Sequence, residues 1–506
     1  MADRVRIELQ PLGESFELER GTPLQDVLFA HGVEFPCGGR QRCKGCRVRT
    51  VQGSIPITPE QEAILTREEL DAGWRLACTA KADSDLTLEL GQWEAAILAD
   101  NTVFDFTPRE GLGVAVDLGT TTIVAQLLDL SNAHVLAVRS ALNRQARHGA
   151  DVMSRVSYAL KEEGRQRLLS LVRNQIGRLI GELLEAAHVS RKPIETVTIV
   201  GNTVMHHLFC GIDLTPLSAY PFEPVRDGLE TSRASELGWE IAGDPAVRFL
   251  PCLGGFVGSD ILAGILATRL HESDALVGLV DLGTNGEIVI GNRERILCAS
   301  TAAGPAFEGA RISMGMRAAT GAISKVTVEE GRLACHVLGE TTPRGICGSG
   351  LVDAVAASLD VGLIEPSGRL CNGSKGSLML CEPVAITQAD IRELQLAKGA
   401  IAAGIRLLLA RWGAAAKDLT RLYLAGAFGN YINRASARRI GLLNFPLEMV
   451  KPAGNTALLG AKLALFNDRE EAFAYPSLRA MVEHISLHTE PTFQDVFAEE
   501  MTFPSS

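Results

Sequence analysis

The sequence lacks an excess of positive charge: 49 Lys and Arg residues face 60 Asp and Glu residues, and the formal net charge is -11. This balance excludes a nucleic acid or an anionic membrane surface as the expected main partner, because either would select Lys and Arg. Residues 1–10 contain no apolar signal core, and no later run reaches the roughly 18 apolar residues that a spanning helix needs. We therefore expect a cytoplasmic protein without membrane segments.

Disulfides are not expected in a reducing cytoplasm, yet the chain has 11 cysteines. Four of them follow the pattern Cys37-x5-Cys43-x2-Cys46, with Cys78 after a longer interval. Four thiolates complete a [2Fe-2S] site, and the short spacings let one loop wrap the cluster. Zinc is the alternative, but zinc sites more often pair two Cys-x2-Cys knuckles, and only one is present. We predict that these four residues hold a [2Fe-2S] cluster.

The other seven cysteines lie in apolar or glycine-rich contexts, where packing is the expected role. They are Cys210, Cys252, Cys298, Cys335, Cys347, Cys371 and Cys381. Cys347 precedes an expected helix and could be an activated thiol, but packing is favoured there too. Around the predicted cluster, Arg40, Arg42, Lys44, Arg47 and Arg49 form a basic collar. It would suit an acidic redox partner, and a merely solvated loop is the equal alternative.

Apolar alternation divides the chain into regions of different texture. It predicts strands at 5–9, 15–18 and 86–90 and a helix at 24–31, which together make a small sheet with one helix over residues 1–95. After a linker at 96–112, apolar strands ending in glycine loops alternate with long helices such as 166–187 and 391–412. That alternation is typical of an α/β architecture. We expect two lobes, 113–277 and 278–470, with a C-terminal tail at 471–506 packed on them.

An internal repeat supports the two lobes. The sequence Asp-Leu-Gly-Thr occurs at Asp117 and again at Asp281, each time after an apolar strand. The glycine lets a phosphate approach the backbone, the threonine and N–H groups can donate hydrogen bonds, and the carboxylate can hold a metal ion or orient water. A third glycine-rich segment follows at 422–429. The alternative is that these glycines merely terminate strands.

With these three segments the chain resembles the superfamily of acetate and sugar kinases, heat-shock chaperone ATPases and actin. The resemblance implies an α+β β-grasp ferredoxin domain followed by a two-lobed α/β actin-like (RNase H-like) ATPase that binds ATP and Mg²⁺. It implies catalytic roles for Asp117 and Asp281. The implied nucleotide contacts are Gly119, Thr120 and Thr121 in the first loop, Gly283, Thr284 and Asn285 in the second, and Gly426, Ala427 and Gly429 at the adenosine.

Two further segments, 300–310 and 345–350, place glycine-rich turns ahead of expected helices, where N–H groups can bind an anion. Together with the N-terminal cysteines they resemble the reductive activators of corrinoid enzymes over nearly the whole chain. His206 and His207 follow another apolar strand and are as consistent with packed helix residues as with functional ones.

This resemblance implies an ATP-dependent transfer of one electron from the [2Fe-2S] cluster to Co(II), giving Co(I). The implied partners are a corrinoid protein or corrinoid-dependent methyltransferase and an electron donor such as a ferredoxin or flavodoxin, and the oligomeric state stays open, with a homodimer among the alternatives. Other hypotheses are a small-molecule kinase with a fused ferredoxin domain, an electron carrier that binds no nucleotide, and an activator of a different low-potential enzyme such as a radical dehydratase.

Overall fold

The computed structural model describes the larger part of the chain. The described residues are 3–10, 14–30, 46–90, 104, 106–149, 151–283, 285–309, 311–316, 318, 321–339, 342–371, 376–429, 431–466 and 475–505. Cys37, Cys43 and Thr284 lie outside them, as do Arg40, Arg42 and Lys44 of the basic collar. Among the described helices, none is long and apolar enough to cross a membrane.

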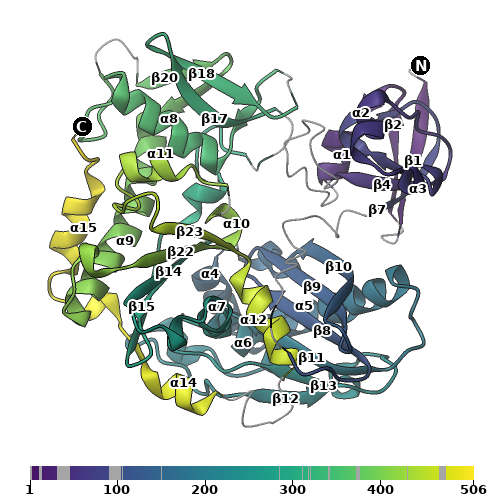
Figure 1. The fold of residues 1–506 in the computed structure, drawn as a ribbon, viewed down its shortest axis with the longest axis horizontal. Helices are drawn as coiled ribbons and strands as arrows, with labels where there is room; N and C mark the ends of the chain where they lie inside the picture. Colours follow the sequence, from purple (N-terminus) through teal and green to yellow (C-terminus); the bar gives the residue numbers. More distant parts are fainter. Residues whose placement is uncertain are drawn as a thin grey trace.

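The N-terminal region forms a five-stranded sheet of its own, with strand order β2-β1-β7-β4-β5 (Figure 1). Its strands are β1 (Arg4–Gln10), β2 (Glu14–Glu19), β4 (Arg47–Gln52), β5 (Trp74–Leu76) and β7 (Leu86–Leu90), and β3 (Thr22–Pro23) pairs with β6 (Lys81–Ala82). The central pair β1–β7 is parallel. Alternation in β1 buries Val5, Ile7 and Leu9, as the sequence predicted. Besides α1 (Leu24–Ala30), the short helices α2 (Pro59–Ile64) and α3 (Arg67–Asp71) are present, so the expected single helix is wrong.

A six-stranded sheet of order β10-β9-β8-β11-β13-β12 forms the first lobe. Its strands are β8 (Leu112–Leu118), β9 (Thr122–Asp129), β10 (His134–Leu142), β11 (Ile194–Gly201), β12 (Glu230–Arg233) and β13 (Ala246–Phe249). The strands β8, β9 and β10 are antiparallel neighbours, whereas β11 runs parallel to β8 and to β13. The long helix α5 (Glu162–Ala186) packs its apolar stripe against one face, close to α4 (Val152–Ala159) and α6 (Thr203–Cys210).

The second lobe repeats this topology with the order β23-β22-β14-β15-β16-β24. Its strands are β14 (Val277–Leu282), β15 (Gly286–Gly291), β16 (Ile296–Thr301), β22 (Arg421–Ala425), β23 (Val450–Gly454) and β24 (Val482–His484). Here β14, β15 and β16 are antiparallel neighbours, while β22 is parallel to β14 and to β23. Helix α9 (Gln388–Trp412) covers one face. The internal repeat found in the sequence is therefore a repeat of five strands with one topology.

The second lobe carries an additional layer of short elements, drawn at the top of Figure 1. They are β17 (Ala322–Glu329), β18 (Arg332–Val337), β19 (Gly345–Ile346), α8 (Gly348–Asp360), β20 (Ser377–Cys381), β21 (Val384–Thr387) and α11 (Arg434–Arg439). Near the C-terminus, α14 (Pro476–Met481) precedes β24, the last strand of the second sheet, and α15 (Phe493–Met501) follows it. Lys398 Nζ on α9 donates to Thr502 O at 2.9 Å, and Phe503 is fully buried, which fixes the chain end to α9.

Two helices, α7 (Ser259–Thr268) and α12 (Thr456–Leu465), lie where the two lobes meet. Helix α7 follows the first sheet but shares an apolar cluster with β14, and α12 follows the second sheet but packs on β8 and β11. The two helices cross in direct contact, because a Cβ at Gly460 would overlap the backbone of Ala263. The start of α12 therefore lies on the first lobe, whereas α7 begins on the first lobe, where Ser259 is hydrogen-bonded to Gly201, and contacts the second lobe through β14.

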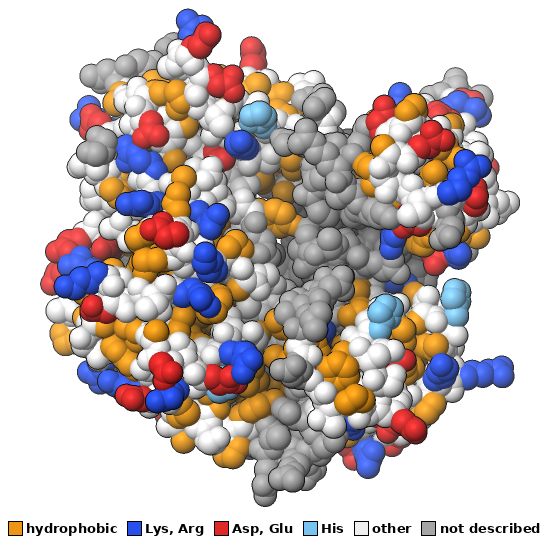
Figure 2. Space-filling model, viewed as in Figure 1, with side chains coloured by type: hydrophobic (Ala, Val, Ile, Leu, Met, Phe, Trp, Pro, Cys, Tyr) orange, Lys and Arg blue, Asp and Glu red, His pale blue; other side chains and the backbone are white. Residues whose placement is uncertain are grey.

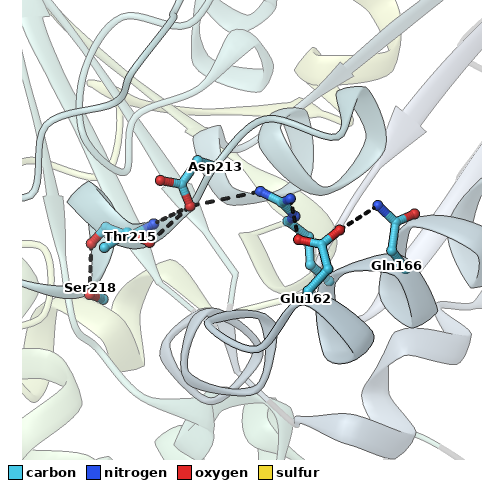
Figure 3. A network of polar contacts seen from close by, with 6 residues as sticks. Glu162, Gln166, Asp213, Thr215 and Ser218 are labelled. Atoms are coloured by element: carbon cyan, nitrogen blue, oxygen red, sulfur yellow. Dashed lines mark hydrogen bonds and ion pairs between the residues drawn. The ribbon is translucent and has the colours of Figure 1, made fainter.

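The outer surface is mixed in charge. Figure 2 shows Lys and Arg side chains interspersed with Asp and Glu. One polar network on the first lobe links the start of α5 to the 3-10 turn after α6 (Figure 3). In it Arg165 lies between Glu162 and Asp213, Gln166 Nε2 donates to Glu162 Oε1 at 2.9 Å, and Thr215 Oγ1 donates to Asp213 Oδ1 at 2.9 Å. Such exposed pairs contribute little stability, roughly 0–1 kcal/mol each.

Candidate functional site

The two described cysteines of the predicted cluster lie side by side. Cys46 directly precedes β4, and Cys78 lies in a 3-10 turn directly after β5. Because β4 and β5 are antiparallel, with Arg47 opposite Leu76, the two cysteines meet at one end of the pair. Their Sγ atoms are 3.2 Å apart, and Ala77 N donates to Cys46 O at 2.8 Å. Two thiol sulfurs this close can bind one iron atom, so this half of the site fits an iron-sulfur cluster.

A buried glutamine supports this cysteine turn and was missed in the sequence. Gln61 on α2 donates from Nε2 to Thr79 Oγ1 at 2.8 Å and accepts from Leu76 N at 3.4 Å. It therefore contacts the backbone before Cys78 and the threonine side chain after it. No local pattern could reveal it, because the contact spans 15 to 18 residues.

The basic collar is smaller than the sequence suggests. Arg47 forms an ion pair with Glu69, with Nη1 and Oε1 2.8 Å apart, and its guanidinium lies 5.0 Å from the Trp74 ring centroid. Arg49 pairs with Glu89. No acidic residue lies between Cys37 and Arg49 in the sequence, but acidic partners arrive from α3 and β7. At these two positions the positive charge of the collar is paired within the domain.

The first aspartate–glycine loop (residues 117–122) joins β8 to β9. Gly119 N donates to Thr122 O at 3.1 Å, which closes the turn. Three buried side chains hold the loop: Asn202 Nδ2 donates to Thr120 Oγ1 at 2.9 Å, Asn143 Nδ2 to Gly119 O at 3.0 Å, and Arg155 Nη2 to Thr120 O at 2.6 Å. Burial lowers the pKa of Arg155 to about 10, which still leaves it charged at neutral pH. This loop is rigidly mounted before any ligand binds.

The second aspartate–glycine loop (residues 281–286) joins β14 to β15. Gly283 N donates to Asn285 O at 3.0 Å. The third predicted segment meets this loop: Ala425 pairs with Asp281 across β22 and β14, and α10 (Gly426–Gly429) begins directly after it. Gly426 has φ +84°, and a Cβ there would lie 2.5 Å from Asp281 Oδ1. The structure thus brings the second and third segments together; the Ala427 side chain lies outside the described part.

Four carboxylates from the two lobes influence one another. Burial raises the pKa of Asp117 to about 6, that of Asp281 to about 7 and that of Asp260 to about 8. Repulsion from Asp117 contributes at both other aspartates, and the pKa of Glu287 is raised well above its usual range by burial and by Asp260 and Asp281. The predicted Asp117 and Asp281 therefore face a common region, and Asp260 and Glu287 are additions that the sequence did not reveal. Within the described residues, no group of three or more His, Cys, Asp and Glu side chains could hold a metal ion.

Asn455 is a further residue that sequence reasoning missed. It caps α12, since its Oδ1 accepts from Leu458 N at 2.8 Å, and its Nδ2 donates to Asp117 Oδ2 at 2.9 Å. An Asn before an apolar helical run is a recognisable capping signal. The signal predicts the cap but not the contact with Asp117.

The two other glycine-rich segments have different outcomes. The segment 345–350 does precede a helix, α8, with Cys347 as its buried first cap residue. The segment 300–310 itself contains a 3-10 turn at Pro305–Glu308, and among the described residues after it no helix begins before α8, so the helix expected there is wrong. Phe307 from this turn stacks on Phe428 of α10, with ring centroids 4.8 Å apart. This contact places the segment 300–310 beside the third predicted segment.

The His206–His207 pair is packed in the core. Both side chains are fully buried on α6, and burial lowers their pKa values to about 3 and 4. His207 Nδ1 lies 2.9 Å from Thr203 O, and the His206 ring contacts Phe249 edge-on. Cys252 and Cys298 are likewise buried. These positions follow the packing interpretation.

Comparison with known proteins covers almost the whole chain. Residues 7–83 match the model of the 2Fe-2S iron-sulfur cluster binding domain, residues 112–273 that of the RACo middle region, and residues 275–506 that of the C-terminal domain of RACo, the ASKHA domain. The corrinoid activation enzyme RamQ of Eubacterium limosum is 35% identical over 439 residues, which is 80% of this chain and 74% of RamQ.

A [Co(II) methylated amine-specific corrinoid protein] reductase of Methanosarcina barkeri is 29% identical over 424 residues, 77% of each chain. A solved structure of a reductive activator for corrinoid, iron-sulfur protein aligns over 99% of this chain and 98% of its own, with 28% identity and a TM-score of 0.69. The predicted fold class, a ferredoxin-type domain followed by an actin-like two-lobed domain, is confirmed by these matches.

Proposed function

This chain belongs to the family of reductive activators of corrinoid proteins, and from that premise we propose that it uses ATP to deliver one electron to the Co(II) form of a corrinoid protein, giving Co(I). The electron comes from an external donor such as a ferredoxin or flavodoxin. The names of its relatives support the corrinoid partner. The observation that carries the use of ATP is the pair Asp117 and Asp281, which lie at equivalent strand ends of two lobes with one topology and close enough that Asp117 raises the pKa of Asp281.

ATP is needed because Co(I) is a strong reductant that an iron-sulfur centre of ordinary potential does not populate well. A shortfall of about 200 mV for one electron corresponds to about 5 kcal/mol. The protein can cover this difference only if ATP and the corrinoid partner each bind two of its conformations with different affinity. Helices α7 and α12 lie between the two lobes, and a change in the relative position of the lobes would move them.

Cys37, Cys43, Cys46 and Cys78 would hold the [2Fe-2S] cluster, and the 3.2 Å Sγ separation of the last two fits that role. When bound, the cluster supplies a centre that accepts and releases single electrons. The chain itself contributes the rigid turn around Cys78, which Gln61 fixes. Pairing of Arg47 with Glu69 keeps that side of the domain electrically balanced.

In the ATPase lobes, the proposed role of Asp117 and Asp281 is to orient the attacking water and the transferring phosphate, for which a carboxylate must be ionised. Thr120 accepts from Asn202 but can donate its own hydroxyl hydrogen to a phosphate oxygen. The remaining proposed nucleotide contacts are Gly119, Thr121, Gly283, Thr284, Asn285, Gly426, Ala427 and Gly429. Mg²⁺ brought with ATP would draw most of its ligands from phosphate and water oxygens.

The test is the anaerobic visible spectrum of a corrinoid protein in the Co(II) state, mixed with the reduced protein with and without ATP. We expect the Co(I) band to appear only when ATP is present. Several corrinoid proteins should be tried, including one that serves methylated amines. No Co(I) with any of them, together with phosphorylation of a small metabolite, would replace this proposal by the kinase hypothesis.

A matched pair of cysteine variants controls for damage to the fold. C78S should abolish Co(I) formation while leaving ATP turnover measurable, because the cysteine turn and the ATPase lobes are separate units. C335S, on β18 of the second lobe, should keep both activities. Equal loss in the two variants would show that the effect is not specific to the predicted cluster.

A further inference from the structure

Asn455 connects the two lobes at the first aspartate–glycine loop. It lies between β23, an edge strand of the second sheet, and α12, which packs on β8 and β11 of the first sheet. Its two side-chain atoms have separate tasks: Oδ1 caps α12 by accepting from Leu458 N, and Nδ2 donates to Asp117 Oδ2. Asp117 and Asn455 are 338 positions apart in the chain.

The surroundings of Asp117 make this hydrogen bond significant. Its charged neighbours are Asp260 at the start of α7 and Asp281 at the end of β14, and the charge of Asp117 raises the pKa of both. Among the residues that the structure describes, the hydrogen bond to this carboxylate comes from the Asn455 amide alone. A neutral donor that contacts a carboxylate favours the ionised form, and the Asn455 hydrogen bond accordingly lowers the pKa of Asp117 against the rise that burial causes.

Among the described residues, no side-chain amide donates to Asp281 as Asn455 does to Asp117. Helix α7 also lies between the lobes, and its cap position is Gly258. A Cβ at Gly258 would overlap Gly201 O and the Asn202 backbone, so no side chain can project from there toward Asp281. The amide donor is thus a property of the first loop.

We propose that Asn455 is a positioning residue for ATP turnover, which holds the Asp117 carboxylate in its working orientation only while α12 is seated on the first lobe. This inference rests on the proposed function, because it assigns a part to Asn455 in the same ATPase site. The position of α12 on the first lobe then affects the aspartate of the first loop directly. If the start of α12 moves with the second lobe, the first loop loses its donor.

Substitutions at Asn455 can separate the cap from the contact. Ser and Asp are both good cap residues, so N455S and N455D keep an acceptor for Leu458 N. N455S replaces the amide donor to Asp117 with a hydroxyl on a shorter side chain, whereas N455D replaces it with a second negative charge of the same shape. We expect kcat for ATP to fall at least about tenfold in N455S and about a hundredfold in N455D, because one oriented donor is worth factors of this size. KM for ATP and the unfolding midpoint should change little in N455S.

Asn292 provides the matched control. It lies in the turn between β15 and β16, at the end of the sheet opposite to the second aspartate–glycine loop, and its Oδ1 accepts from Glu294 N at 2.9 Å. N292S and N292D make the same chemical changes there and should retain wild-type kcat. The proposal is overturned if both Asn455 variants keep kcat within twofold of wild type, or if the loss falls on KM. Wild-type protein without any ATP turnover would overturn the proposed function itself, so the two failures are distinguishable.

Discussion

The loop after β8 and the loop after β14 begin with the same residues, Asp-Leu-Gly-Thr, on strands of equal place in two sheets of one topology. Their neighbours differ. Asp117 lies opposite Val124 on the next strand and accepts a hydrogen bond from Asn455, whereas Asp281 lies opposite Glu287 and has Gly426 against its carboxylate. Both aspartates have Asp260 as a neighbour, but across its own hairpin the first aspartate faces a valine and accepts an amide hydrogen bond, whereas the second faces another acid.

The difference comes from one residue in turn length. In the first hairpin Leu118 pairs with Ile123, and in the second Leu282 pairs with Gly286, so the second turn is one residue shorter. Shifting a strand by one residue moves its side chains to the opposite face. Glu287 and the buried Ile123 are each six residues after the aspartate of their repeat. Because of the shorter turn, Glu287 pairs with Asp281 across the hairpin, and the two side chains lie on the same face of the sheet. A duplicated sequence has become two chemically different sites.

The largest effect is expected on ATP turnover, in a comparison of Asp281 and Glu287, which pair across the second hairpin. D281N should lower ATP turnover about a hundredfold, because it removes a carboxylate proposed to orient the reactants. E287Q should change turnover at pH 7 by no more than about threefold, since the pKa of Glu287 is raised well above its usual range and Gln resembles the protonated acid. Steady-state ATP hydrolysis measures both.

Equal losses in D281N and E287Q would mean that Glu287 acts as an ionised group, and the contrast between the opposed acids would be wrong. E294Q is the control, because Glu294 is exposed in the turn at the far end of the same hairpin.

The next effect tests the close approach of Gly426 to Asp281. G426A introduces a Cβ at φ +84° that would lie 2.5 Å from Asp281 Oδ1 and 2.7 Å from Leu282 O. We expect the free energy of unfolding to fall by about 3 kcal/mol, from backbone strain and overlap together. Urea unfolding in the absence of nucleotide measures the change.

G413A is matched in backbone geometry, with φ +90° at the end of α9, but a Cβ there meets nothing within 4 Å. Its cost should be about 1 kcal/mol, the penalty of the left-handed conformation alone. If the two variants cost the same, the contact with Asp281 contributes nothing.

The smallest effect is in the pH dependence of stability. Asp281 has an ordinary pKa of 3.8 that is raised to about 7 by burial and by Asp117. Between these values the folded protein binds more protons than the unfolded chain, so its contribution to the free energy of unfolding falls as the pH rises. The free energy of unfolding should fall between pH 4 and pH 7 by about 1–2 kcal/mol less in D281N than in the wild type, after allowance for solvent screening.

Unfolding midpoints at several pH values, without nucleotide, give this slope. D274N is the control, since the Asp274 side chain is 78% exposed. The assignment of a raised pKa would be contradicted if D281N left the pH dependence of stability unchanged. It would also be contradicted if Asp281 made stability rise with pH.

The sequence by itself determined the features that depend on a few neighbouring residues. It predicted the alternating strands at 5–9 and 86–90, the two aspartate–glycine loops and the helix after residue 347, because turns, caps and alternation are written in local order. The family resemblance and the fold class also followed from the order of these motifs, and the comparisons confirm both. The roles of individual nucleotide contacts stay predictions.

Only the tertiary structure decided which groups meet. Arg47 finds Glu69 from a later helix, Glu287 turns toward Asp281 through one missing turn residue, and Asn455 reaches Asp117 across 338 positions. These contacts depend on strand register, on the position of α7 and α12 between the lobes and on burial, and the order of neighbouring residues specifies none of these. The charge state of a carboxylate depends on everything within a few ångströms of it, so it is a property of the folded protein and not of the motif that carries it.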